Sequence, residues 1–91
     1  MERIPHFING ALISDAERYG PVFNPATGEQ EKEVALASAA RVEEAIQAAR
    51  AALPGWRATS LAKRTTIFFK VRELLMQRRP ELAALLTSEH G

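Results

Sequence analysis

The spacing of hydrophobic positions changes near Ser38, from short apolar runs to a helical repeat. In the first part, residues 7–8 and 12–13 are two short β-prone runs, and Asn9 and Gly10 lie between them. Asn-Gly favours a two-residue turn in which both residues take positive φ, so this segment predicts a β-hairpin.

A second strand pair is predicted between residues 22–23 and a return run that ends in residues 34–36. Residues 15–20, DAERYG, read as an exposed connection that leads into it. Within the pair, Pro25 suits the second position of a turn and Gly28 can take a left-handed conformation. The expected turn therefore lies in the NPATGE string.

After Ser38, which is the natural N-cap, the apolar positions follow a helical period. They are Val42, Ala45, Ile46, Ala49 and Leu53. Pro54 and Gly55 are predicted to end this first helix, and Trp56 is then interpreted as an anchor that packs the loop between helices onto the core.

Ser60 is predicted to cap a second helix, which Pro80 prevents from continuing. At 100° per residue its apolar side chains span roughly 220°, about twice the stripe that a surface helix needs, so one neighbour cannot cover them. These side chains are Ile67, Phe68, Phe69, Val71, Leu74, Leu75 and Met76. A third helix follows, with Pro80 at its first position and Gly91 as a C′ cap.

The pattern as a whole predicts an α+β fragment. Two N-terminal β-hairpin-like strand pairs precede three α-helices at about 39–53, 61–78 and 80–90.

Composition limits the core and the partners. The 91 residues allow one domain at most, and 16 of the hydrophobic residues are Ala, so few large side chains are left for a core. A net charge of +1 gives no long-range attraction to nucleic acid or to anionic lipid. No run approaches the roughly 18 apolar residues of a membrane span, and no signal peptide is visible, so a cytoplasmic location is the default.

Motifs for catalysis and cofactor binding are missing from the residues. The five glycines are scattered and form neither a dinucleotide-binding nor a P-loop fingerprint. The chain has no Cys, which excludes a thiolate metal site and a Cys nucleophile. His6 and His90 lie at opposite ends of the chain, so a transition-metal site would need most of its ligands from elsewhere. The basic residues of the second helix scatter around it, whereas a helix that follows a phosphate backbone needs them aligned on one face.

The closing string LLTSEHG offers one candidate pair, Glu89 and His90. Neighbours in a helix point about 100° apart, so the two side chains cannot form a hydrogen-bonded acid/base pair on one face. The alternative is structural, because a positive charge on His90 near a helix C-terminus is favoured by the helix dipole.

An ordered set of strings carries a resemblance along nearly the whole chain. FINGALI, VFNPATGE, VALASAARVEEAIQAARAALPGW, AKR and ELAALLTSEHG resemble the N-terminus of the aldehyde dehydrogenase superfamily. IPHFING, RYG and EHG look most like its CoA-acylating methylmalonate-semialdehyde dehydrogenases.

The resemblance implies a larger enzyme with an α/β Rossmann-type cofactor domain, of which residues 1–91 are an incomplete N-terminal part without a catalytic domain. Such enzymes use NAD and coenzyme A and oxidise an aldehyde through a Cys thioester. This chain lacks that Cys, so it is expected to be inactive and to hold no cofactor of its own. Its expected partners are the remainder of the parent enzyme and further copies in a homo-oligomer, with no nucleic acid and no membrane.

The resemblance also implies one site. Some relatives hold a monovalent cation with two backbone carbonyls and a carboxylate, at positions that correspond to Val22, Phe23 and Glu89. Glu89 is Asp in those relatives, and the alternative is that Glu89 is an exposed helix residue. Two rival interpretations of the chain remain: an independent non-catalytic interaction or self-association module, and an active dehydrogenase.

Overall fold

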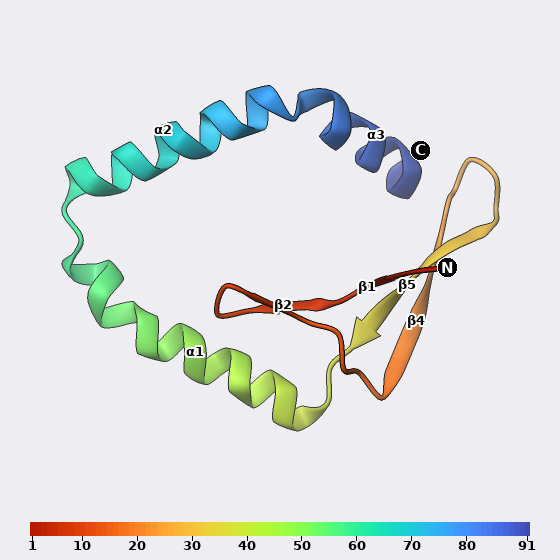
Figure 1. The fold of residues 1–91 in the computed structure, drawn as a ribbon, viewed down its shortest axis with the longest axis horizontal. Coiled ribbons are helices and arrows are strands. Elements are labelled where there is room, and N and C mark those ends of the chain that lie inside the picture. The colour runs from red at the N-terminus through yellow and green to blue at the C-terminus, as the bar shows by residue number, and fades with distance from the viewer.

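The computed structural model describes residues 1–91, in which five strands precede three helices. The strands are β1 (Glu2–Ile4), β2 (His6–Ile8), β3 (Ala11–Ile13), β4 (Arg18–Phe23) and β5 (Gln30–Leu36). The helices are α1 (Ala39–Ala58), α2 (Leu61–Gln77) and α3 (Arg79–His90). Figure 1 shows the helices following one another around a flat, open ring, which the strands close. The predicted α+β order is confirmed.

The hairpin predicted around Asn9 and Gly10 is confirmed. Strands β2 and β3 pair antiparallel, with Phe7 opposite Leu12, and φ is 52° at Asn9 and 75° at Gly10. Positive φ at both central residues defines a type I′ turn, whose twist matches that of the strands it joins.

The second predicted strand pair is also confirmed, with a longer first strand than the pattern indicated. β4 begins at Arg18, so the interpretation of residues 15–20 as an exposed connection is wrong for their second half. β4 pairs with β5 from Arg18↔Leu36 to Phe23↔Gln30, and Gly20 lies close to the Leu36 and Val34 side chains. Arg18 and Gly20 lower the local strand propensity of this segment, but its pairing with β5 outweighs that propensity.

Strand β1 was not predicted. It pairs in parallel with the central strand β5, so that the sheet has the order β1-β5-β4. Arg3 lies opposite Glu33, its Nε donates to the Glu33 carboxylate at 2.9 Å, and its guanidinium lies 4.3 Å from the centroid of the Tyr19 ring. The hydrogen bond and the charge of Glu33 raise the pKa of Arg3. A three-residue strand that pairs across about 30 positions leaves no local pattern to read.

Helix α1 corrects the prediction of an end at residue 53. It continues through Pro54 and Gly55 to Ala58, so Trp56 lies in the helix and not in a loop. Proline removes one N–H from the helix ladder, but the carbonyls of the last turn gain other donors. The Thr59 hydroxyl donates to the Gly55 carbonyl at 2.8 Å, and the Arg64 guanidinium donates to the Trp56 and Arg57 carbonyls at 2.6 and 3.2 Å.

The other helix ends are as predicted, within a residue or two. The hydroxyls of Ser38 and Ser60 accept from the amides of Arg41 and Lys63, as N-caps do. Helix α3 begins at Arg79, so Pro80 is its second residue and not its first, and Gly91 caps its end with φ 93°.

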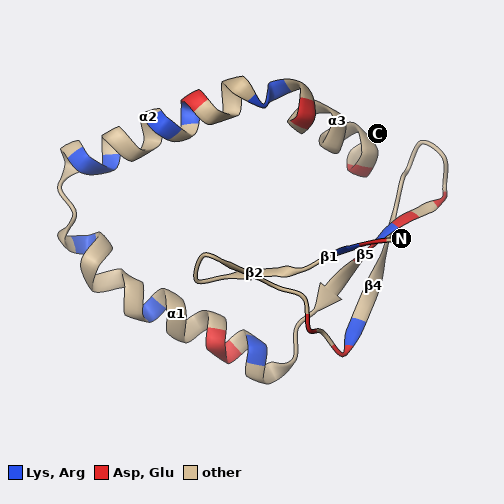
Figure 2. Ribbon diagram, in the orientation of Figure 1, with Lys and Arg blue, Asp and Glu red and all other residues tan.

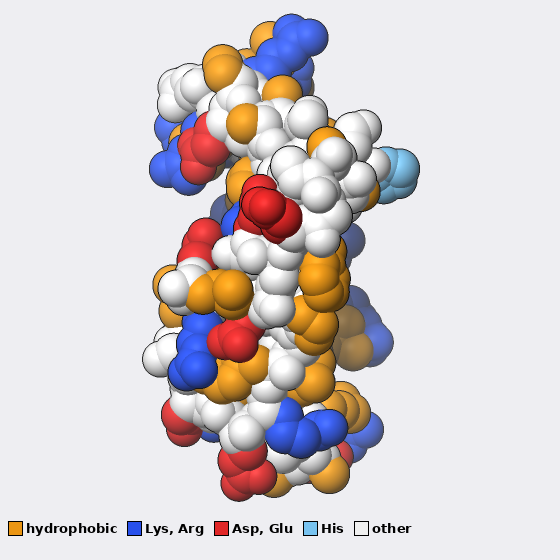
Figure 3. Space-filling model, turned by 90° about the vertical axis from the view of Figure 1, so that its right-hand side faces the viewer, with side chains coloured by type: hydrophobic (Ala, Val, Ile, Leu, Met, Phe, Trp, Pro, Cys, Tyr) orange, Lys and Arg blue, Asp and Glu red, His pale blue; other side chains and the backbone are white.

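The molecule is open and has almost no core. Ala35 is its one buried residue, and the substantial packing contacts join strand to strand and α2 to α3. The radius of gyration is 16.8 Å, against about 12 Å for a compact chain of this length. The accessible surface of 7413 Å² exceeds that of a compact monomer of 10.0 kDa by about 2,200 Å². Figure 3 shows hydrophobic side chains at the surface, between charged ones.

Candidate functional site

Asn24 organises the NPATGE turn between β4 and β5. Its backbone carbonyl accepts a hydrogen bond from the Gly28 N–H at 2.8 Å, and its backbone N–H donates to the Glu29 carbonyl at 2.9 Å. The side-chain oxygen accepts from Ala26 N, and the side-chain amide donates to Glu31. One residue thus holds both ends of the loop, which explains why Asn precedes Pro25 here.

The end of α3 returns to this turn. A Cβ placed on Gly91 would lie 3.6 Å from Pro25 Cγ, and Figure 1 shows the C-terminus beside the β4–β5 connection. Residues far apart in sequence are therefore neighbours at this point of the ring.

The three predicted cation ligands lie on the two elements that meet there. Val22 is half-buried near the end of β4, Phe23 is its last residue and is exposed, and Glu89 is exposed on the last turn of α3. The ladder between β4 and β5 shifts register between Val22 and Phe23. Val22 pairs with Lys32 and Phe23 pairs with Gln30, so the residue that the pairing skips is Glu31 of β5. No three His, Asp or Glu side chains form a metal-binding cluster anywhere in the chain.

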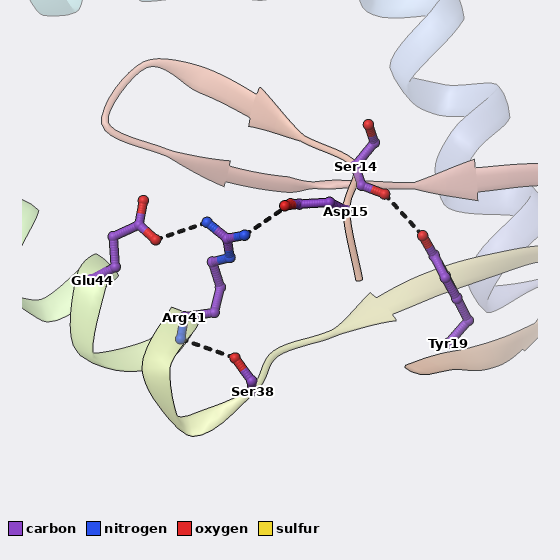
Figure 4. Close-up of polar contacts among 6 residues, drawn as sticks. All are labelled: Ser14, Asp15, Tyr19, Ser38, Arg41 and Glu44. Atoms are coloured by element: carbon purple, nitrogen blue, oxygen red, sulfur yellow. Dashed lines mark hydrogen bonds and ion pairs between the residues drawn. The ribbon is translucent and has the colours of Figure 1, made fainter. Parts of the chain in front are cut away.

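Arg41 connects the start of α1 to the segment that follows the β2–β3 hairpin (Figure 4). Its guanidinium lies 2.8 Å from Asp15 Oδ1 and 2.7 Å from Glu44 Oε2, while its backbone amide donates to Ser38 Oγ. The Tyr19 hydroxyl, on β4, donates to the carbonyl of Ser14 in this segment at 2.9 Å. The Asp15–Arg41 ion pair thus joins α1 to the segment that leads into β4.

A polar hollow of about 370 Å³ adjoins this cluster. Its polar lining residues are His6, Asp15, Glu17, Arg18, Ser38 and Arg41. Acidic and basic groups are mixed in it and the principal ones already pair with each other, so the hollow has neither a free nucleophile nor a uniform charge for an anionic ligand.

Arg64 forms the corner between α1 and α2. Its guanidinium lies 4.9 Å from the centroid of the Trp56 ring, besides the two carbonyls of α1 to which it donates. Its Nε is buried without a hydrogen-bond partner. The Trp56 anchor therefore acts through Arg64 and not by packing on a core.

The largest uncovered features are apolar. A groove of about 430 Å³ runs between the β2–β3 hairpin and α1. Its apolar lining residues are Phe7, Ile8, Ala37, Val42, Ala45, Ile46 and Ala49. On α2, Phe68, Phe69 and Met76 are 61%, 65% and 58% exposed, so the arc that one neighbour could not cover is indeed uncovered. Exposed apolar surface on this scale is typical of interaction sites and ligand-binding grooves.

Neither the charged residues of the helices nor the Glu89–His90 pair forms a binding or catalytic site. Helix α1 contains both acidic and basic residues, and the basic residues of α2 are interrupted by uncharged ones, with Glu73 as its one acidic residue (Figure 2). Glu89 and His90 are exposed neighbours that share no hydrogen bond. No helix is long and apolar enough to cross a membrane.

Comparison with known proteins assigns the class. The sequence model of the aldehyde dehydrogenase family matches residues 12–91. The chain belongs to the aldehyde dehydrogenase family, and its fold is that of the family's N-terminal part.

Its relatives include semialdehyde dehydrogenases. It is 42% identical over 91 residues to malonate-semialdehyde dehydrogenase of Pseudomonas aeruginosa and 38% identical over 89 residues to malonate-semialdehyde dehydrogenase 2 of Bacillus cereus. It superposes with a TM-score of 0.94 and 47% identity on methylmalonate-semialdehyde dehydrogenase from Oceanimonas doudoroffii. It superposes with a TM-score of 0.92 and 42% identity on a Sinorhizobium meliloti protein assigned to the same activity, whose structure contains NAD.

These matches cover all or nearly all of the chain but only a small part of each relative. The chain spans 18% of the length of both curated relatives and 19% of each solved structure. The resemblance read from the sequence is confirmed at the level of the family and its semialdehyde dehydrogenases. The Arg41 cluster and the Arg64 corner were missed, because Asp15 and Trp56 give no signal of an arginine partner until the chain has folded.

Proposed function

We propose that this chain forms the N-terminal part of an NAD-dependent semialdehyde dehydrogenase of the malonate or methylmalonate type. The whole enzyme would oxidise a semialdehyde to an acyl-CoA through a Cys thioester. The observation that carries this proposal is similarity over the full chain, at 42% to 47% identity, to proteins with those names. The chain without the rest of such an enzyme is inactive in this proposal.

The residues of this chain do not fit a dinucleotide site. Phosphate cradles use a glycine-rich turn at a helix N-terminus, whereas α1 is preceded by Ala37 and Ser38, and the adjacent hollow contains Asp15 and Glu17. We therefore assign the NAD and coenzyme A sites to the remainder of the enzyme, and residues 1–91 to an incomplete part of its cofactor domain.

The role of the chain in this proposal is to cover other parts of the enzyme. The excess surface of about 2,200 Å² is well above the roughly 800 Å² that one partner contributes to a stable protein interface. The groove beside α1 and the uncovered arc of α2 supply the apolar faces for that contact. Continued polypeptide and further copies in a homo-oligomer are the proposed occupants.

A monovalent cation site at Val22, Phe23 and Glu89 is part of the same proposal. Support comes from the register shift opposite the two proposed carbonyl donors and from the approach of the α3 end to Pro25. Oxygen ligands of this kind suit a hard cation such as Na⁺. Further ligands would come from the remainder of the enzyme.

The test is a segment exchange in the Pseudomonas aeruginosa relative, whose matching segment is replaced by this chain. The matched control carries the corresponding segment of the Bacillus cereus relative. We expect the exchanged enzyme to reduce NAD with malonate semialdehyde and coenzyme A at a rate similar to the control. An active control beside an inactive exchanged enzyme would contradict the proposal. Aldehyde-dependent NAD reduction by the 91-residue chain alone would contradict its inactivity.

A further inference from the structure

Asn9 and Asn24, the two asparagines of the chain, lie in opposite chemical settings. The side chain of Asn24 is held by two hydrogen bonds, and the next residue, Pro25, has no N–H. Asn9 is exposed, its side chain makes no hydrogen bond, and the N–H of Gly10 donates none in the turn. No atom approaches within 4 Å of the position that a Cβ on Gly10 would take.

We propose that Asn9 is a site of spontaneous deamidation. The backbone nitrogen of Gly10 attacks Cγ of Asn9, the Cγ–Nδ2 bond breaks, and ammonia leaves with the amide proton of Gly10. A five-membered succinimide results. Water then adds to one of its two carbonyl carbons and opens the ring to aspartate or isoaspartate. Overall, the side-chain amide of Asn9 is hydrolysed by one water molecule to a carboxylate and ammonium, and no atom is oxidised or reduced.

The folded hairpin slows this reaction. Ring closure needs the Gly10 nitrogen on the same side as the Asn9 side chain, which requires negative ψ, whereas the left-handed conformation of a type I′ turn has positive ψ. The turn must therefore open before the attack. A two-stranded hairpin is marginally stable by itself, and the directly opposed Phe7 and Leu12 are both more than 70% exposed, so opening is accessible.

Asn24 cannot follow the same path. Proline at position 25 has no backbone N–H to lose, so a neutral succinimide cannot form there. The same chain thus contains a reactive and an unreactive asparagine, and the two can be compared in one sample.

The product differs from the native turn in charge and in backbone length. One deamidation removes the single net positive charge of the chain. Isoaspartate inserts an additional methylene into the main chain, which is incompatible with the two-residue connection between Ile8 and Ala11. The hairpin side of the groove beside α1 is then altered, because Phe7 and Ile8 line it.

The experiment incubates the exchanged enzyme, in which this chain replaces the matching segment of the Pseudomonas aeruginosa relative, for weeks at mildly alkaline pH. Both asparagines of the chain are followed by peptide mapping and mass spectrometry. We expect Asp and isoAsp to accumulate at position 9 with none at position 24, and Gly10→Ala to slow the reaction at least tenfold. The synthetic peptide HFINGALIS should react faster than the chain, and Leu12→Ala, which weakens the cross-strand pair, should speed the chain by about two- to five-fold. An unchanged Asn9, equal reaction at Asn24, or an equal rate in chain and peptide would overturn the proposal.

Discussion

The Arg64 guanidinium lies 4.9 Å from the centroid of the Trp56 ring and donates a 2.6 Å hydrogen bond to the carbonyl of the same residue. One side chain of α2 thus binds both the ring and the backbone of the last turn of α1. The planar guanidinium can stack and donate at once, which a lysine ammonium cannot do. This contact stabilises the helical end that Pro54 would otherwise weaken.

Replacing Arg64 should loosen that corner. We expect Arg64→Ala to lower the local stability of residues 55–60 by about 1–2 kcal/mol, because charged hydrogen bonds and a stacked cation are lost together. Amide hydrogen exchange of these residues in the exchanged enzyme should accelerate about 5- to 30-fold. Arg64→Lys should fall between Arg64→Ala and wild type. The control is Arg72→Lys, on an exposed position of the same helix, and a similar acceleration there would contradict a specific role.

This corner also shows where prediction from the sequence ends. The hairpin turn, the two serine caps and the C′ glycine were all predicted, because each depends on residues within a few positions of one another. The end of α1 depends on a donor eight residues downstream, whose position exists only after α2 has formed. The prediction that Pro54 and Gly55 end the helix therefore made α1 five residues too short.

The first turn of α1 should depend more on its cap than on its ion pair. Ser38→Ala removes the acceptor for Arg41 N and should cost about 1 kcal/mol, independently of salt. Asp15→Asn weakens an ion pair whose acidic partner is 78% exposed, and it should cost less, with a difference that disappears at high salt. Hydrogen exchange of the first-turn amides at two salt concentrations measures both effects. A larger cost for Asp15→Asn would mean that the ion pair, and not the cap, holds the helix start.

The isolated chain should associate through its uncovered helices. Phe69 and Met76 are more than half exposed on α2, and burying them stabilises any partner that covers the helix. We expect oligomers or a molten state in gel filtration and circular dichroism, and a shift toward monomer in Phe69→Glu. Lys63→Glu, on the polar side of the same helix, is the control for added charge. A cooperative, monomeric fold of the wild-type chain would support the rival interpretation as an independent module.

The candidate site was less accessible to prediction than the fold. Val22, Phe23 and Glu89 came from family resemblance, since no spacing in the sequence connects a strand end to the last turn of a third helix. The structure adds the register shift opposite Val22 and Phe23 and the approach of Gly91 to Pro25, two features that arise from pairing across the sheet and from closure of the ring. Strand β1 was hidden for the same reason, because its pairing partner lies about 30 residues away.

The cation site can be tested through Glu89 in the exchanged enzyme. A ligand that binds only the folded state stabilises it, by about 1.4 kcal/mol at ten times its Kd, so replacing Na⁺ by a bulky organic cation at constant ionic strength should lower the thermal midpoint. Glu89→Gln should abolish most of that difference, because the amide keeps an oxygen but loses the charge that balances the cation. Glu89→Asp, which places the carboxylate of the relatives at this position, should preserve it. The control is Glu81→Gln, which removes an exposed carboxylate from the first turn of the same helix. If Na⁺ has the same effect on the wild-type exchanged enzyme and on Glu89→Gln, Glu89 is an exposed helix residue without a ligand.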